Sequence, residues 1–82
     1  MPKVVKVTPR ENATLLLSFD GGEQRMFDAS PYLSKGIFTE LADPNYLGLA
    51  KPFFGGVWWP HGQDFSADTL YLESQPVGEA VL

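Results

Sequence analysis

The chain has 82 residues, of which 44% are hydrophobic and 13% aromatic, a composition that predicts one compact domain with a thin core. The chain has six lysines and arginines and ten aspartates and glutamates, which gives a net charge of −4. The basic residues are scattered and form no cluster that could follow a phosphate backbone, which argues against a nucleic-acid partner. The chain lacks cysteine, a secretory apolar segment and any apolar run of about 18 residues that could span a bilayer, so we expect a cytoplasmic protein without disulfides or membrane contact.

The N-terminal third predicts a strand followed by a β-hairpin. Residues 3–9, KVVKVTP, are rich in valine and end at a proline, which is typical of a strand. Residues 12–28 contain two strand-like segments around the glycines of DGGE, where a turn can adopt positive φ. Alternation in the first segment places four apolar side chains on one face: Ala13, Leu15, Leu17 and Phe19.

The middle third predicts three brief helical turns, near residues 31–34, 37–42 and 44–48. A short polar residue precedes proline twice, in Ser30-Pro31 and in Asp43-Pro44. Each pair suits an N-cap followed by the first helical position. Glycines interrupt these segments, so one long helix is not expected.

The last third predicts a second hairpin, a turn and a closing helix. Gly55 and Gly56 lie between two aromatic segments and suit the hairpin turn, and PHG suits the next turn. Ser66 suits the N-cap of a helix over SADTLYLES, with Asp68 complementing the helix dipole. We expect one α+β domain over residues 1–75 and a flexible tail over 76–82. Its antiparallel sheet is built from the two hairpins and the N-terminal strand, with short helices on one side.

The sequence offers few groups for catalysis or metal binding. His61 is the single histidine and lies between proline and glycine, so an exposed turn is the simplest interpretation. Asp64 and Asp68 are four residues apart and could form a carboxylate pair of the kind that glycosidases use. Structural roles at the start of the helix explain both residues more simply. Asp64 can accept hydrogen bonds from backbone N–H groups in the turn, and Asp68 lies near the positive end of the helix dipole. We therefore expect no catalytic residue, no metal and no cofactor, and interpret the protein as not an enzyme.

Trp58 and Trp59 are adjacent on a predicted strand, so their side chains must point to opposite faces. One ring can join the core. The other would pack under a helix, in a dimer interface or against another protein, because monomers rarely expose large apolar patches. Tryptophan is also favoured as an anchor of interfaces. The candidate binding surface comprises the aromatic pair and polar residues after it: Trp58, Trp59, His61, Asp64, Asp68 and Tyr71.

Two stretches resemble a known family. LLLSFDGGEQRMFDASPYLSKGIFTEL and WPHGQDFSADTLY, in this order, resemble the two halves of the small bacterial domain of unknown function 2442 family. The resemblance runs from about Leu15 to Tyr71 and departs from the family pattern at His61, where asparagine is usual, and at Ala67, where proline is usual. It implies an α+β domain without a known catalytic residue or cofactor. Because stand-alone members are often encoded beside a small toxin-like protein, it also implies an antitoxin-like or accessory binding role.

The leading hypothesis is a non-enzymatic protein-interaction module whose partner is a small basic protein or a second copy in a homodimer. The acidic balance, the surplus of aromatic residues near Trp58 and Trp59 and the family resemblance motivate it. An alternative is a small-molecule-sensing domain with a pocket between the second hairpin and the helix from Ser66, where Asp64 and Tyr71 would be the polar contacts. Hydrolysis by the Asp64 and Asp68 carboxylates is a third hypothesis and would require a cleft around them.

Overall fold

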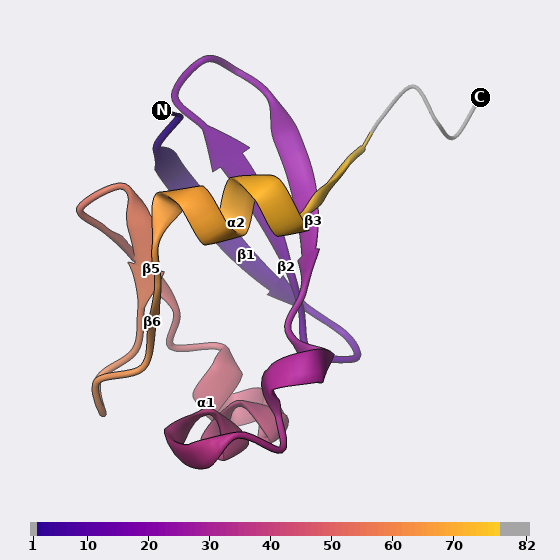
Figure 1. The fold of residues 1–82 in the computed structure, drawn as a ribbon, viewed down its shortest axis with the longest axis vertical. Helices are drawn as coiled ribbons and strands as arrows, with labels where there is room; N and C mark the ends of the chain where they lie inside the picture. The colour runs from indigo at the N-terminus through magenta and orange to yellow at the C-terminus, as the bar shows by residue number, and fades with distance from the viewer. Residues whose placement is uncertain (1, 78–82) are drawn as a thin grey trace.

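The computed structural model describes residues 2–77 and arranges them in two antiparallel sheets, with helical segments at one end and across one face (Figure 1). The larger sheet has the strand order β1-β2-β3-β7: β1 Val4–Arg10, β2 Thr14–Phe19, β3 Gln24–Asp28 and β7 Gln75–Pro76. The smaller sheet has the order β4-β5-β6: β4 Lys51–Phe53, β5 Gly56–Trp58 and β6 Asp64–Phe65. The predicted α+β class is confirmed, with the two hairpins divided between two sheets rather than joined in one.

The apolar alternation of β2 places this strand at the centre of the first hairpin. Leu15, Leu17 and Phe19 are buried, whereas the residues between them are half-buried on the other face. β2 pairs with β1 on one side and with β3 on the other. The carbonyl of Phe19 accepts a hydrogen bond from the N–H of Gly22, whose φ of 95° glycine adopts without steric cost. The predicted strand and hairpin are confirmed.

Three short helical segments follow β3 and match the three predicted turns: η1 Ser30–Tyr32, η2 Gly36–Ala42 and α1 Pro44–Leu47. The predicted Asp43 cap is confirmed, because its carboxylate accepts a hydrogen bond from the N–H of Asn45 at 2.9 Å. The predicted Ser30 cap is wrong. Ala29 occupies the cap position of η1 without a side-chain bond, and the carboxylate of Asp28 accepts the hydrogen bond from the N–H of Ser30.

The second hairpin turns at Phe54 and Gly55, one residue earlier than the predicted turn at Gly55 and Gly56. Phe53 pairs with Gly56, which makes Gly56 the first residue of β5. The neighbouring strand explains this register, because a Cβ at Gly56 would collide with the carbonyl oxygen of Phe65 on β6. Gly56 is therefore needed for the close approach of two strands rather than for the turn.

Helix α2, Ala67–Glu73, lies across one face of the larger sheet (Figure 1). Ser66 caps it as predicted, by accepting a hydrogen bond from the N–H of Thr69 at 3.2 Å, and Asp68 lies in its first turn. After the helix, Pro76 pairs with Arg25 in β7, so the first residue of the predicted tail belongs to the sheet. Residues 78–82 of that tail lie outside the described residues.

The core lies where the two sheets and the helical segments meet. Its large buried apolar side chains come from both sheets, from η2 and α2, and from the residue that follows β5: Phe27, Leu15, Leu17, Val57, Leu41, Leu70 and Trp59. Phe65 connects the two sheets, because its ring packs edge-on against Phe27 and Trp59 at centroid distances of 5.0 and 5.9 Å. No helix within residues 2–77 has the length and apolar character needed to cross a bilayer.

Candidate functional site

The six residues of the predicted binding surface do not form one surface. They lie in the core (Trp59), on the outer face of the smaller sheet (Trp58 and Asp64), in two separate polar networks (His61 and Tyr71) and in the first turn of α2 (Asp68). The aromatic and acidic members that share the smaller sheet are therefore the ones that can act together.

Trp59 is not a surface residue, which corrects its place in the predicted set. Its side chain is 0% exposed, and its Nε1 donates a hydrogen bond to the carbonyl of Leu47 at 3.1 Å. The polar group of the ring is thus satisfied inside the core. Trp58 is half-buried on the opposite face, as strand alternation requires, so the outward ring of the pair is that of Trp58.

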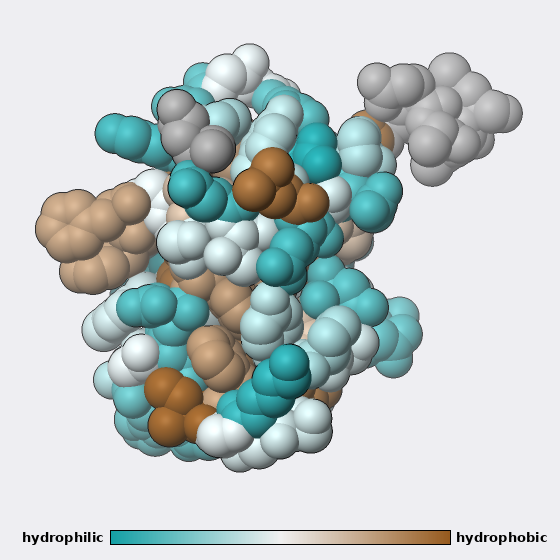
Figure 2. Space-filling model, viewed as in Figure 1, coloured by the Kyte–Doolittle hydropathy of each residue, from teal (hydrophilic) through white to brown (hydrophobic). Residues whose placement is uncertain are grey.

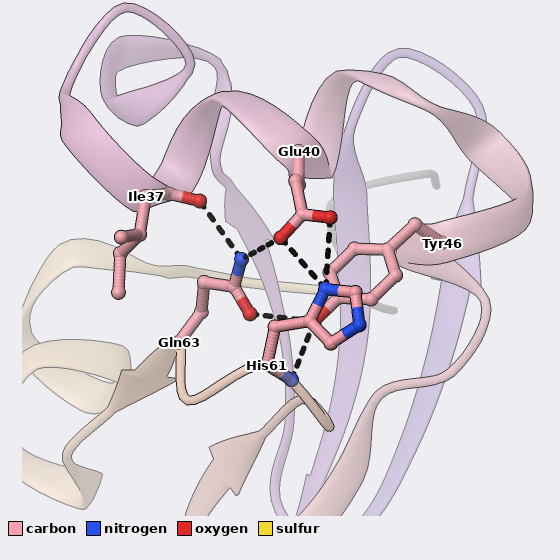
Figure 3. Close-up of polar contacts among 5 residues, drawn as sticks. All are labelled: Ile37, Glu40, Tyr46, His61 and Gln63. Carbon is pink, nitrogen blue, oxygen red and sulfur yellow. Dashed lines mark hydrogen bonds and ion pairs between the residues drawn. The ribbon is translucent and has the colours of Figure 1, made fainter.

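His61 lies in an exposed turn before β6, as predicted, and joins a polar network with Glu40, Tyr46 and Gln63 (Figure 3). Its Nδ1 lies 2.9 Å from Oε2 of Glu40, and its backbone N–H donates to the hydroxyl of Tyr46 at 2.9 Å. The His61 and Tyr46 rings stack with a centroid distance of 5.0 Å. Because Glu40 and Tyr46 belong to η2 and α1, the network ties this turn to the helical segments.

Gln63 is the buried centre of this network. Its amide nitrogen donates to the carbonyl of Ile37 and to Oε1 of Glu40, each at 2.8 Å, and its amide oxygen accepts from the hydroxyl of Tyr46 at 2.6 Å. Hydrogen bonds from Gln63 first, and from His61 second, lower the pKa of Glu40 from its usual value of 4.5. Since no buried side-chain polar atom within residues 2–77 lacks a partner, we interpret the network as an anchor for the turn.

Tyr71 belongs to a second network, on the larger sheet. Its hydroxyl donates to Glu23 at 2.8 Å, and the guanidinium of Arg25 lies over its ring at 4.3 Å. Hydrogen bonds from Tyr71 first, and from Arg25 second, lower the pKa of Glu23, and the same Glu23 bond raises the pKa of Tyr71. Arg25 also donates to Oγ and to the carbonyl of Ser74, each at 2.7 Å, which ties β3 to the end of α2. Tyr71 is thus engaged away from Asp64.

Within residues 2–77, the most exposed large apolar side chain, Phe54, lies in a cluster on the β4–β5 hairpin that we name the aromatic hairpin: Phe53, Phe54 and Trp58. Phe54 is 94% exposed and Phe53 is 50% exposed. Ring centroids lie 4.5 Å apart between Phe53 and Phe54, and 5.5 Å apart between Phe53 and Trp58. Figure 2 shows an apolar mass that projects where Figure 1 shows the tip of this hairpin. Of the three residues, only Trp58 is in the predicted binding surface. The sequence does contain a signal for the other two, because Phe53 and Phe54 directly precede a pair of glycines that suits a turn.

The tip of the aromatic hairpin has an unfavourable backbone. The φ angles of Phe54 and Gly55 are 48° and 83°, so the two-residue loop between the paired Phe53 and Gly56 has the features of a type I′ turn. Asparagine or glycine usually takes the first position of this turn, because a Cβ in the left-handed region costs about 1–2 kcal/mol. Phenylalanine at this position lowers the stability of the hairpin and holds its ring in solvent.

Asp64 lies beside the aromatic hairpin. Lys51, Trp58 and Asp64 form a row across the smaller sheet, because Trp58 pairs with both of the others. A depression of about 250 Å³ lies between the hairpin and the start of α2, and its lining includes Phe53, Phe54 and Asp64. It occupies the place where the small-molecule hypothesis expects a pocket, with Asp64 but without Tyr71.

Comparison with known families identifies the family of this chain. Residues 4–76 match a family described as protein of unknown function, DUF2442. The chain belongs to the DUF2442 family. The match includes β1 and β7, which lie beyond the resemblance between Leu15 and Tyr71. Searches of curated proteins and of solved structures found no match to the chain.

In this DUF2442 chain the aromatic hairpin and both polar networks lie inside the matched range. Within residues 2–77, no group of three or more histidine, aspartate and glutamate side chains is placed to hold a metal ion. Asp64 lies on β6 and Asp68 on α2, so they do not share the helical face that the carboxylate-pair hypothesis assumes. The smaller sheet presents the exposed ring of Phe53 and the half-buried ring of Trp58 beside the acidic side chain of Asp64.

Proposed function

We propose that this domain is a non-enzymatic protein-interaction module of the cytoplasm that docks its partner on the aromatic hairpin. The observation that carries the proposal is Phe54, an almost fully exposed ring on a turn residue with a left-handed backbone. Turn chemistry alone favours asparagine here, and backbone strain is concentrated at functional positions. Recognition of a partner accounts for a residue that the stability of the hairpin does not favour.

The proposed partner is a small basic protein rather than a nucleic acid. The net charge of −4 favours the encounter with a basic surface. The resemblance to the DUF2442 family suggests that the role is antitoxin-like or accessory. A second copy in a homodimer is the competing partner, and we favour the basic protein because two copies bring like net charges together.

Small-molecule sensing is the second candidate, and the depression beside Asp64 is the observation that favours it. Its volume of about 250 Å³ is below the range of about 300–1,000 Å³ that is usual for ligand pockets. Tyr71, the second polar contact expected there, donates its hydroxyl to Glu23 instead. One side chain of a protein partner fits this space better than a metabolite does.

The test compares the wild-type chain with Phe54→Ser and with Leu72→Ser. Leu72 is 74% exposed on α2 and controls for the loss of an apolar surface side chain away from the hairpin. Proteins that co-purify with the tagged chain from its own cells are identified by mass spectrometry, and each candidate is then produced and titrated by calorimetry. We expect Phe54→Ser to raise the Kd at least about tenfold and Leu72→Ser to leave it unchanged.

Equal binding by all three forms, or a loss with Leu72→Ser alone, would contradict docking on the aromatic hairpin. Sedimentation equilibrium of the purified chain tests the competing partner. If the purified chain forms a dimer and Phe54→Ser dissociates it, the partner on the aromatic hairpin is a second copy of the chain rather than a basic protein.

A further inference from the structure

The depression beside the aromatic hairpin combines two kinds of group that attract a cation. Phe53 and Phe54 supply exposed phenyl rings, and Asp64 supplies a carboxylate. Gly56 lines the space between the hairpin and β6 without adding a side chain. The face of an aromatic ring carries partial negative charge and the carboxylate carries a full one, so both favour the same type of ligand group.

No basic group within residues 2–77 neutralises Asp64. The ion pairs in this part of the chain join Arg25 to Glu23 and His61 to Glu40. Lys51 lies two strands from Asp64, with Trp58 between them, which is about 10 Å at the usual spacing of strands. Lys3 is near the turn, where its side-chain carbons face Gly55. A cation from outside the chain can therefore pair with Asp64.

We propose that this depression binds an arginine side chain of the partner protein. The inference rests on the proposed function, because it takes the aromatic hairpin as the docking surface. A guanidinium is planar, so it can stack on a phenyl ring while its N–H groups donate to a carboxylate. The ammonium group of lysine is a compact charge that cannot stack in this way. A space of about 250 Å³ suits one such side chain.

The probe is the peptide acetyl-Gly-Arg-Gly-amide, titrated into the ¹⁵N-labelled protein and followed by NMR. A second peptide carries citrulline, which keeps the shape of arginine and removes its charge. We expect saturable shifts of the amide signals of Phe54, Gly56 and Asp64 with the arginine peptide, at a Kd of about 1–10 mM for a single side chain. The citrulline peptide is expected to cause no saturable shift.

Two charge-matched variants test the role of the carboxylate. Asp64→Asn should weaken binding of the arginine peptide and of the basic partner at least about fivefold, since it removes the charged acceptor. Glu11→Gln removes the same charge from an exposed position between β1 and β2, and both affinities should stay unchanged.

The outcomes separate this inference from the proposed function. A partner that depends on Phe54, combined with no effect of Asp64→Asn and no binding of the arginine peptide, would overturn the arginine site and leave the docking surface standing. Equal binding of the arginine and citrulline peptides would overturn the site as well. Specific binding of the arginine peptide without any protein partner that depends on Phe54 would overturn both proposals, because the depression would then serve free guanidinium compounds.

Discussion

Gln63 holds together segments that are far apart in the chain. Its amide contacts Ile37 and Glu40, which lie 26 and 23 residues before it. We expect Gln63→Leu to lower the free energy of unfolding by about 1–3 kcal/mol, because the Ile37 carbonyl, the Glu40 carboxylate and the Tyr46 hydroxyl all lose their hydrogen bonds to the buried amide. Urea unfolding followed by circular dichroism measures this loss. Gln75→Leu replaces an exposed glutamine and is the control, and an equal loss in both variants would contradict the structural role of Gln63.

Glu40 makes the same network dependent on pH. Hydrogen bonds from Gln63 and His61 hold the pKa of Glu40 below 4.5 in the folded state. A lowered folded pKa contributes stability that is fully present above the unfolded pKa and is lost as the pH falls through the folded pKa. Glu40→Gln should therefore destabilise the protein near neutral pH, and its difference from wild type should shrink as the pH falls below 4.5.

Urea unfolding of both forms between about pH 6 and about pH 3 checks this trend. Glu11→Gln removes one negative charge from an exposed position and separates the effect of the network from a change in net charge. A difference between wild type and Glu40→Gln that stays constant over this range would contradict the assigned hydrogen bonds.

At the scale of secondary-structure elements, the stability of the β4–β5 turn and the proposed recognition of a partner favour different residues at position 54. Phe54→Asn should raise the free energy of unfolding by about 1 kcal/mol, because asparagine tolerates the left-handed backbone of a type I′ turn. The same variant should weaken binding of the partner at least about tenfold, since it removes the exposed ring. Phe54→Ala keeps the strain and removes the ring, so it should weaken binding without raising stability. Thermal unfolding and calorimetry measure both effects, and a less stable Phe54→Asn would show that the ring supports the fold.

Local patterns predict elements whose signal lies within a few residues, and β2 is an example because its buried face follows from alternation alone. Contacts between distant segments decide the rest. Ser30 and Asp43 both precede proline, yet only Asp43 caps: η1 begins one residue earlier than predicted, with Ala29 at its cap position and the carboxylate of Asp28 bound to the N–H of Ser30. The turn register is likewise set by the close approach of Phe65 to Gly56.

In the candidate site, too, local patterns predict some features, and contacts between distant segments decide the others. Alternation predicts that the rings of Trp58 and Trp59 point to opposite faces, but only the placement of β5 in the fold shows which of them is buried. The partner of Trp58 across the sheet, Asp64, follows from the pairing of β5 with β6, which the sequence does not specify. The exposure of Phe54 follows from a turn register that is one residue earlier than the glycine pair indicates.

At the scale of the whole molecule, the two sheets share one core and should unfold together. Phe65 of the smaller sheet packs on Phe27 of the larger one, and the N–H of Val4 donates to the carbonyl of Gly55 at 2.8 Å. The second contact supports the turn of the aromatic hairpin from β1. The proposed docking surface, held in this way, would lose little conformational entropy when a partner binds, which favours affinity.

Trp58 and Trp59 provide the test of this arrangement. Trp59→Ala should lower the free energy of unfolding by about 3–5 kcal/mol, a large share of the about 4–12 kcal/mol expected for a domain of this length. Circular dichroism and fluorescence should report one shared transition, because Trp59 belongs to the single core cluster that residues of both sheets form. Trp58→Ala should leave the fold intact and weaken binding of the partner, since its ring lies on the outer face against Phe53. If both variants unfolded equally, the ring of Trp58 would belong to the core, and the aromatic hairpin would stabilise the fold rather than recognise a partner.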